Sequence, residues 1–529
     1  MIAMRKLVII FVVLISSTLI LQAQDFTVSS GKTVTIAKTG SLTVGGAFSN
    51  SGTVTLNSDS DEFAVIKVSG TSSGNITYNR WVNQVGSGDW DLIGSPVSGQ
   101  TISNFVSVNT AGDDDLATSG VQYAVGVYNN STDTWDNYTN DGSGAGNVSA
   151  AGNFDIGKGY AMASVDGGST LAFTGAISVD NETQAIEDND NDNSGAGRIW
   201  NLVANPYPSY LNVNTNADGS NNLLTINGTT YLHDTYVAVY GWDADGSGYT
   251  IYNQSSNATY LAPGQAFMVA SDDSGGTTIS FTEAMQTTSG GDDFISGDTM
   301  DDVFEVLLRL YHGEEEIEET RLYFEDGLSL GLNPGYDAGA FDENAALMTR
   351  LVEEDEGYGM AINAMSTESM DDVVIPLEIN QTAGQEFRVN LHTNSIGEIN
   401  IYLEDTELQT LTLLNEEDFV LNPTSDLSDA GRFYVHLTAD TLSNEEVNTS
   451  LLNAYKSVDN NYITIEGLAT QATSTDVSLF NILGTKVMDT ALDNTTNTQM
   501  ISTNGLSTGI YVLKLVSGEN QLTKKLIIK

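Results

Sequence analysis

The 529-residue sequence contains no cysteine, so it offers neither a disulfide framework nor a cysteine ligand or nucleophile. Basic residues are also scarce, at 19 Lys plus Arg against 70 Asp plus Glu, and the formal net charge is −51. So large a negative charge argues against nucleic acid and anionic membranes as partners, because both repel an acidic surface. We interpret the acidity as that of a well-solvated extracellular surface.

Long hydrophobic runs are almost absent. The one such run, residues 7–21, follows Arg5 and Lys6 and precedes Ala23. It is shorter than the roughly 20 residues that a membrane-spanning helix needs, so we expect no transmembrane segment. A basic start, a short apolar stretch and a small residue near the cleavage point predict a secretory signal peptide over residues 1–23.

Proline is rare, with 7 residues, whereas glycine is abundant, with 51. Between turns rich in Gly, Ser, Asn and Asp stand short apolar runs of period two, which is typical of all-β proteins. In residues 24–85 such runs, for example TVTI, SLTV and TVTL, follow one another closely. They predict a short N-terminal β-solenoid or a meander.

The sequence contains an internal duplication. DWDLIGSP returns as IWNLVANP, VGVYNNSTDTW as VAVYGWDADGSGY, GKGYAMAS as GQAFMVAS, and STLAFTGA as TTISFTEA. The four elements keep their order, with offsets of 107 to 112 residues. They predict two tandem β-sandwich-like domains, residues 86–180 and 198–290, joined by an acidic linker over residues 181–197.

Aromatic residues recur in both copies. The alignment pairs Trp90 with Trp200, Tyr128 with Tyr240 and Phe173 with Phe281. Because the two tryptophans are duplicated with their apolar neighbours, we interpret them as core residues and not as platforms for a ligand.

Two further tryptophans, Trp135 and Trp242, stand in polar turns. Exposed aromatic side chains on a secreted β-rich protein can bind a ligand such as a sugar. We therefore predict these two residues as the candidate ligand-binding residues.

Residues 300–441 change in composition to apolar strands bounded by acidic turns, which predicts an acidic β-sandwich. Within it, DENAALMTRLVEED could instead form a short helix. GLSLG, residues 327–331, matches the nucleophile-elbow pattern around Ser329, and His392 and His436 follow. The motif requires a helix after the serine, whereas LNPGYDAG predicts a loop. We therefore assign no catalytic residue.

Two acidic turns could bind a structural calcium ion, because Ca²⁺ prefers clustered oxygen ligands. The candidate ligands are Asp188, Asp190, Asp192, Asp243 and Asp245. Neither turn completes an EF-hand, and a solvated acidic linker explains the first turn equally simply. We expect no other cofactor.

The last residues carry the most specific pattern in the chain. DVSLFNILGTKVMDTAL is followed by NGLSTGIYVLKLVSGENQLTKKLIIK, and the final KKLIIK closes the sequence. Over residues 455–529 this order resembles the type A C-terminal sorting domain of type IX secretion substrates, a small β-sandwich. Gly509, Tyr511, Lys524 and Lys525 carry the resemblance.

The resemblance implies a destination. The signal peptide would take the chain across the inner membrane, and the type IX secretion machinery would recognise the sorting domain at the outer membrane. The protein would then lie outside the cell or on the outer surface of a Gram-negative bacterium, where attachment to lipopolysaccharide is an option.

The function of the exported part stays open between three classes. The missing catalytic constellation favours a noncatalytic structural or adhesive protein with a matrix partner. A glycan-binding module of a surface polysaccharide-processing system is the alternative, through Trp135 and Trp242. An extracellular hydrolase is the third.

Overall fold

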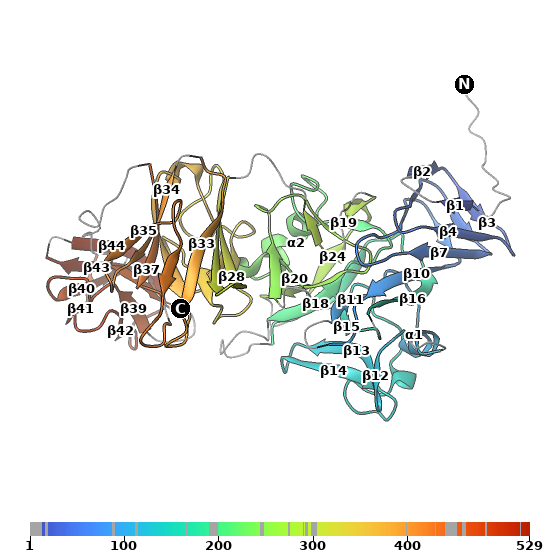
Figure 1. Ribbon diagram of the computed structural model, residues 1–529, viewed down its shortest axis with the longest axis horizontal. Helices are drawn as coiled ribbons and strands as arrows, with labels where there is room; N and C mark the ends of the chain where they lie inside the picture. The colour runs from blue at the N-terminus through green and yellow to red at the C-terminus, as the bar shows by residue number, and fades with distance from the viewer. Residues whose placement is uncertain are drawn as a thin grey trace, which may run out of the picture. The chain divides into compact units, whose positions relative to one another are not determined.

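The computed structural model describes most of the chain, and its described residues fall into two compact units, one within residues 1–300 and the other within residues 301–529. The described residues are 13–15, 20–86, 90–111, 115–165, 167–189, 199–243, 248–272, 276–288, 290, 295–297, 304–397, 399–428, 430–439, 452–456, 462–481, 484–518 and 520–528. The fold is all-β apart from short helices, as predicted (Figure 1).

The first unit begins with a β-solenoid, drawn in blue in Figure 1. Its strands are β1 (Val13–Ile15), β2 (Ile20–Ala23), β3 (Phe26–Val28), β4 (Thr33–Ile36), β5 (Ser41–Val44), β6 (Phe48–Asn50), β7 (Thr53–Asn57), β8 (Val65–Val68), β9 (Ser72–Ser73) and β10 (Asn75–Val82). β4, β7 and β10 pair in parallel, as do β5 with β8 and β3 with β6. A meander would pair its strands antiparallel, so the solenoid alternative is the one formed.

The alternation of apolar and polar residues explains the solenoid interior. In β4 and β7 the valine, isoleucine and leucine side chains are buried, whereas the threonines between them are not. Phe26 and Phe48 stack in successive coils with ring centroids 6.1 Å apart. β1 and β2 lie within the predicted signal peptide and pair in parallel with β4 and β5. The signal peptide itself stays a prediction from the sequence.

Two copies of one fold follow the solenoid. The first contains β11 (Asp91–Ile93), α1 (Ile102–Asn109), β12 (Thr118–Ser119), β13 (Gln122–Asn129), β14 (Thr134–Thr139), β15 (Tyr160–Met162) and β16 (Ser169–Ala176). The second contains β17 (Glu182–Ile186), β18 (Trp200–Ala204), β19 (Tyr210–Asn212), α2 (Leu223–Tyr231), β20 (Val239–Asp243), β21 (Gly248–Tyr252), β22 (Thr259–Leu261), β23 (Ala266–Ala270), β24 (Thr277–Phe281), β25 (Gln286–Thr287) and β26 (Ile295–Gly297). The strand order β11-β15-β13-β14 in the first copy corresponds to β18-β23-β20-β21 in the second.

In each copy, the helix packs against a pair of antiparallel strands. β10 pairs with β16, and β17 pairs with β24. Each copy therefore begins one strand earlier than the sequence predicts, and residues 182–186 form β17 and not part of a linker. The helix rests on this pair through one asparagine: Ala172 N donates to Asn109 Oδ1 at 2.8 Å, and Ser280 N donates to Asn227 Oδ1 at 2.8 Å.

The two copies contact each other reciprocally. Gly94 N donates to Gly264 O at 2.8 Å, and Ala204 N donates to Gly157 O at 2.8 Å. Gly94 is the equivalent of Ala204, and Gly157 of Gly264, so the same positions meet in both directions. Reciprocal contacts of this kind define an isologous, two-fold interface, here within one chain.

The strand register corrects one detail of the sequence alignment. Gly126 pairs with Ala161, whereas Tyr240 pairs with Met268, the equivalent of Ala161. Gly126 is therefore the equivalent of Tyr240, and the alignment of Tyr128 with Tyr240 is wrong by two residues. A shift by two leaves every side chain on the same face of the sheet, so the period-two pattern could not reveal it.

The second unit contains the region predicted as a β-sandwich, for which we keep the name sandwich, and the C-terminal domain. The sandwich strands are β27 (Phe304–His312), β28 (Glu315–Phe324), β29 (Ala338–Gly339), β30 (Leu347–Thr349), β31 (Met360–Met365), β32 (Asp372–Ile379), β33 (Phe387–Asn394), β34 (Asn400–Asp405), β35 (Thr410–Leu413), β36 (Phe419–Leu421) and β37 (Phe433–Thr438). They form one 11-stranded sheet around a single apolar core. All pairs are antiparallel except β28 with β31. The helix considered for DENAALMTRLVEED is not formed, since β30 occupies its centre.

The C-terminal domain has two small sheets around its own core. Its strands are β38 (Asn453–Lys456), β39 (Tyr462–Glu466), β40 (Thr475–Asn481), β41 (Lys486–Leu492), β42 (Gln499–Ser502), β43 (Gly509–Ser517) and β44 (Asn520–Ile528). One sheet has the order β38-β39-β42 and the other β41-β40-β43-β44. β38 belongs to this domain, so the domain begins before the predicted residue 455.

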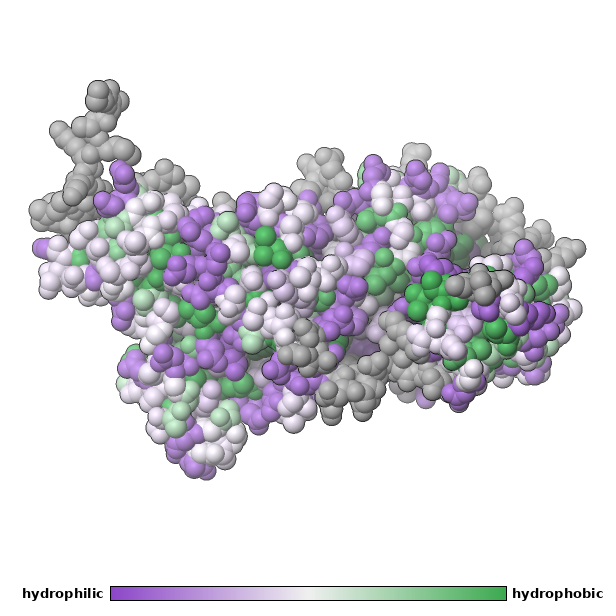
Figure 2. All heavy atoms as spheres, turned by 180° about the vertical axis from the view of Figure 1, so that it is seen from behind, coloured by the Kyte–Doolittle hydropathy of each residue, from purple (hydrophilic) through white to green (hydrophobic). Residues whose placement is uncertain are grey.

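Within the described part of the chain, no helix has both the length and the apolar character needed to cross a membrane. On the face seen in Figure 2, hydrophobic residues form small separate patches among hydrophilic ones.

The two copies provide a matched test of core packing. Trp200 is 2% exposed and packs against Tyr240 with ring centroids 4.6 Å apart, whereas Trp90 is only partly buried. We expect Trp200→Ala to lower the free energy of unfolding by about 3–5 kcal/mol, as for buried tryptophans in general. Trp90→Ala should cost less than half as much. Chemical denaturation followed by circular dichroism compares them, and equal losses would contradict the difference in packing.

Candidate functional site

The structure brings the two predicted ligand-binding tryptophans together in the first unit. Trp135 and Trp242 line one cavity of about 340 Å³. Its lining consists of Trp90, Leu92, Trp135, Asn137, Ala161, Trp242 and Tyr249. We call it the aromatic cavity. Its volume lies within the range of small-molecule sites, which are mostly apolar with few polar groups.

Equivalent hairpins supply the rings on the two sides of the aromatic cavity. Trp135 pairs across the strands with Tyr128, with ring centroids 5.2 Å apart. Trp242 pairs in the same way with Tyr249, also at 5.2 Å. The aromatic pair at this position is therefore part of the duplicated fold. Trp135 is 43% exposed, so its ring is accessible to a ligand.

The phenol groups beside the cavity are held as hydrogen-bond donors. Tyr128 donates from its hydroxyl group to Asp133 Oδ1 at 2.7 Å. Burial, and then this hydrogen bond to Asp133, raise the pKa of Tyr128 above its usual range. Burial and the charge of Asp133 also raise the pKa of Tyr249. Both tyrosines therefore stay protonated at any physiological pH.

Beside the cavity, the first copy has smaller residues than the second copy at two equivalent positions of the sheet. In the second copy, Tyr240 fills the space next to Trp200 and is fully buried. In the first copy, Gly126 takes the place of Tyr240, and Ala161 takes the place of Met268. The same sheet face is thus packed in one copy and hollow in the other. The sequence prediction of a core tryptophan holds for Trp200, whereas Trp90 also lines the cavity.

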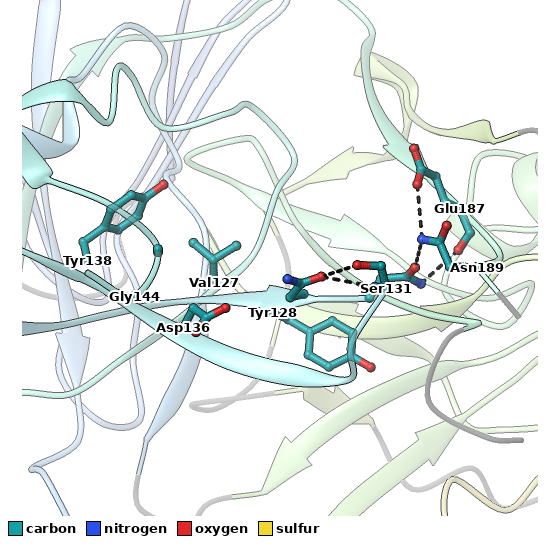
Figure 3. Close-up of a pocket in the computed structure, with 11 residues that line it drawn as sticks. Val127, Tyr128, Ser131, Asp136, Tyr138, Gly144, Glu187 and Asn189 are labelled. Atoms are coloured by element: carbon teal, nitrogen blue, oxygen red, sulfur yellow. Dashed lines mark hydrogen bonds between the residues drawn. The ribbon is translucent and has the colours of Figure 1, made fainter. Parts of the chain in front are cut away.

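A second cavity, of about 460 Å³, lies against the opposite face of the hairpin β13–β14. We call it the polar cleft. Its lining consists of Val127, Tyr128, Asn129, Asn130, Ser131, Asp136, Tyr138, Gly144, Ala145, Glu187 and Asn189. Figure 3 shows Ser131, Asn189 and Glu187 together at one end and Tyr138 at the other, with Val127 and Asp136 between them. No pattern in the sequence pointed to this cleft, because its walls come from segments more than 40 residues apart.

The nucleophile-elbow residues do not form a catalytic site. Ser329 donates from its hydroxyl group to Asn333 Oδ1 at 3.0 Å and to Gly331 O at 3.3 Å. His436 lies 2.8 Å from Glu404, and His392 lies 3.5 Å from Arg309. Among the hydrogen bonds of the described residues, none joins Ser329 to a histidine.

The calcium prediction falls mostly outside the described residues. Asp190, Asp192 and Asp245 lie outside them, and only the backbone of Asp243 is described. Asp188 follows β17 and is partly buried. In the described part of the chain, no three carboxylate or histidine side chains form a group able to hold a metal ion. Calcium binding thus stays a prediction.

The predicted sorting residues lie on the paired strands β43 and β44. Gly509 begins β43, and Tyr511 is buried, with its hydroxyl group donating to Ser507 O at 2.7 Å. Lys524 is only 8% exposed and donates to Asn453 Oδ1 at 2.9 Å. Lys524 is therefore buried, whereas Lys525 is exposed and forms an ion pair with Glu354 at 2.5 Å.

Buried charges join this domain to the sandwich. Arg350 of the sandwich lies 3.2 Å from both Asp355 and Glu378, and its guanidinium stacks 4.3 Å above the ring of Tyr455. Fully buried Glu466 completes the cluster from the C-terminal side, with Lys524 nearby. Burial raises the pKa of Glu466 to about 8, although Arg350 and Tyr455 act in the opposite direction.

The comparisons with known proteins identify both parts of the chain. Residues 459–529 match a secretion system C-terminal sorting domain. The protein is therefore a type IX secretion substrate that interacts with the secretion machinery, and its destination is the extracellular space or the surface of a Gram-negative bacterium. Residues 5–437 match the family described as a domain of unknown function, DUF8693, and the chain belongs to this family. No curated protein matches the chain.

Glu466 makes the stability of the second unit depend on pH. A carboxyl group whose pKa is raised on folding stabilises the fold only while it is protonated, so stability is lost as pH rises from about 4.5 towards about 8. We expect Glu466→Gln, which keeps the shape without the charge, to reduce the fall in Tm between pH 5 and pH 9. The groups that surround Glu466 are the same in the wild type and in the variant: Asp355, Glu378, Arg350, Tyr455 and Lys524.

Glu368→Gln serves as the control, because Glu368 lies in a short surface turn outside the cluster. Its pH profile should match that of the wild type. If the Tm of the wild type and the Tm of Glu466→Gln fell equally as pH rises, ionisation of Glu466 would not be the cause of the loss of stability.

Deleting residues 452–529 should leave the sandwich folded, because its apolar core contains no residue of the C-terminal domain. With the sorting domain gone, we expect the truncated protein to accumulate in the periplasm. Cell fractionation and limited proteolysis measure the two outcomes. Glu354→Ala, which removes only the ion pair to Lys525, should be exported normally. Finding the truncated protein in the medium would contradict the role of the sorting domain.

Proposed function

We propose that the exported protein is a noncatalytic surface protein that binds a glycan in the aromatic cavity. The observation that carries this proposal is the meeting of Trp90, Trp135 and Trp242 around one accessible space. Sugar rings present flat faces of C–H groups, which pack well on aromatic rings, while a few polar groups orient the hydroxyls. Asn137 is the polar side chain in this lining.

The comparison of the two copies supports a ligand at this place. Small side chains on a sheet face make fewer packing contacts than large ones, so an unfilled hollow there contributes less to stability. The second copy shows that Tyr and Met side chains fit on the same sheet face, since Tyr240 and Met268 are buried there. The first copy carries Gly126 and Ala161 instead, which a ligand-binding role explains and a purely structural role does not.

A structural or adhesive role without a soluble ligand is the second candidate. The tandem copies and the sandwich favour it, because they are successive β-domains to which neither the sequence nor the described residues assign a catalytic group. Adhesion to a matrix glycan through the same cavity would unite both candidates, whereas attachment to lipopolysaccharide would concern only how the protein is retained. Membership in a surface polysaccharide-processing system is consistent with the glycan-binding role.

Substitutions in the cavity test the proposal. On an array of polysaccharides and oligosaccharides, we expect the purified protein to bind at least one glycan. Trp135→Ala should weaken that binding about tenfold or more, because removing an aromatic side chain that anchors a ligand costs on the order of 1.4 kcal/mol or more. Ala161→Met, which copies the second copy, should fill the cavity and weaken binding similarly while preserving the fold.

Val121→Ala is the matched control, because Val121 is 40% exposed in the same copy and does not line the cavity. It should bind like the wild type. If the wild type bound no glycan on the array, or if Trp135→Ala and Ala161→Met bound normally, the proposal would be wrong.

A further inference from the structure

The hairpin β13–β14 separates two cavities of opposite character. Trp135 and Asn137 line the aromatic cavity, and Asp136 and Tyr138 line the polar cleft. Successive residues of a strand point to opposite faces, so this alternation follows directly from the sequence WDNY. One short strand thus contributes side chains to both cavities.

The polar cleft combines an apolar floor with polar walls. Val127, Ala145 and Tyr138 contribute apolar surface, and amide, hydroxyl and carboxylate groups surround it. At about 460 Å³, the cleft is large enough for a sugar unit. Sugars are amphipathic in the same way, since C–H faces alternate with hydroxyl groups.

The charge of the cleft is one-sided. Asp136 and Glu187 are carboxylates, and the lining residues that the structure describes include no lysine, arginine or histidine. Carboxylates accept hydrogen bonds from hydroxyl groups and pair with ammonium groups, whereas they repel carboxylate and sulfate groups. The chemistry therefore favours a ligand rich in donors and without negative charge.

The wall that carries Glu187 is held in place before any ligand arrives. Asn130 Nδ2 donates to Glu187 O at 3.0 Å and to Trp200 O at 2.8 Å. Glu187 N donates to Asn201 Oδ1 at 2.9 Å. Ser131 donates from its hydroxyl group to Asn129 Oδ1 at 2.8 Å. The two bonds from Asn130 join the hairpin turn of the first copy to the start of the second, and the other two hold each segment, so binding requires little ordering.

We propose that the polar cleft is a second sugar-binding site, on the other face of the hairpin β13–β14 from the aromatic cavity, and that it selects neutral or amine-bearing sugar units over acidic ones. The inference rests on the proposed glycan binding and adds the chemical class of the ligand. In the second copy, Thr250 pairs with Gly241 where Asp136 pairs with Val127 in the first, so the fold itself does not require a carboxylate there.

Three β-1,4-linked oligosaccharides of equal length test this selection by isothermal titration calorimetry: one of glucosamine, one of glucose and one of glucuronate. We expect the glucosamine oligomer to bind about tenfold more tightly than the glucose oligomer, because an ammonium group forms a charge-assisted hydrogen bond with a carboxylate, stronger than that of a hydroxyl group. The glucuronate oligomer should bind more weakly than both. In 1 M salt the advantage of the glucosamine oligomer should shrink, since salt screens charge pairs.

Asp136→Asn/Glu187→Gln removes both carboxylates and keeps their shapes. With this variant the three oligomers should bind within about threefold of one another, because neutral amides no longer distinguish their charges. The control is Asp180→Asn/Asp272→Asn, which changes the net charge equally at two exposed positions outside the cleft. It should keep the wild-type preference.

The two proposals fail in different ways. If Trp135→Ala abolishes binding and the double carboxylate variant keeps the wild-type preference, the polar cleft is not a second sugar-binding site and glycan binding in the aromatic cavity stands. A wild type that binds the glucuronate oligomer as tightly as the glucose oligomer also overturns the selection. If none of the three oligomers binds and no array glycan depends on Trp135, both proposals are wrong.

Discussion

The candidate site depends on the reciprocal backbone contact between the two copies. Gly94 donates to Gly264, and Ala204 donates to Gly157, each at 2.8 Å. A Cβ atom at Gly94 would lie 2.3 Å from the Cβ of Ala204, so only glycine permits this approach. Gly157 and Gly264 both have positive φ angles, +76° and +70°, which again favour glycine. Because this contact is symmetric, it places the equivalent hairpins of the two copies beside each other.

Duplication gave the protein two equivalent sheet faces, and divergence gave them different roles. The face of the second copy is packed by Tyr240 and Met268 and contributes to stability. The face of the first copy carries the small residues Gly126 and Ala161, and there is space for a ligand beside it. The two copies therefore differ in packing. The second copy fills its sheet face with large side chains, whereas the first contains a cavity and gives up part of that packing energy.

In the second unit, the sorting domain and the sandwich have separate apolar cores and meet through a polar contact. It has its own apolar core, so its fold does not require the sandwich. Its contact with the sandwich is polar instead, with Arg350 at the centre of Asp355, Glu378 and Tyr455. Buried charges add little net stability because desolvation offsets their attraction, but they allow few alternative arrangements. Such an interface orients the sorting domain without making the sandwich depend on it.

The sequence alone determined the class of fold, the duplication and the destination of the protein. Period-two patterns define strands and their buried faces locally, and the ordered elements of the C-terminal domain are specific enough to be recognised. The sequence also indicated Trp135 and Trp242, because each stands among polar residues. The predicted turns are wrong, since Trp135 lies on β14 and Trp242 on β20. It could not separate a solenoid from a meander, since both have the same alternation and differ only in which strands pair.

Only the tertiary structure showed that these tryptophans share one cavity, because residues 107 positions apart meet through the symmetric contact between the copies. Register decided the equivalence of Gly126 and Tyr240, which a shift by two conceals in any period-two pattern. Burial decided the environment of Lys524, since a lysine next to the chain end looks exposed until β44 pairs with β43 and faces the sandwich. The polar cleft, too, is visible only in the tertiary structure. Its carboxylates come from a hairpin and from the segment after β17, and only folding brings them to one space.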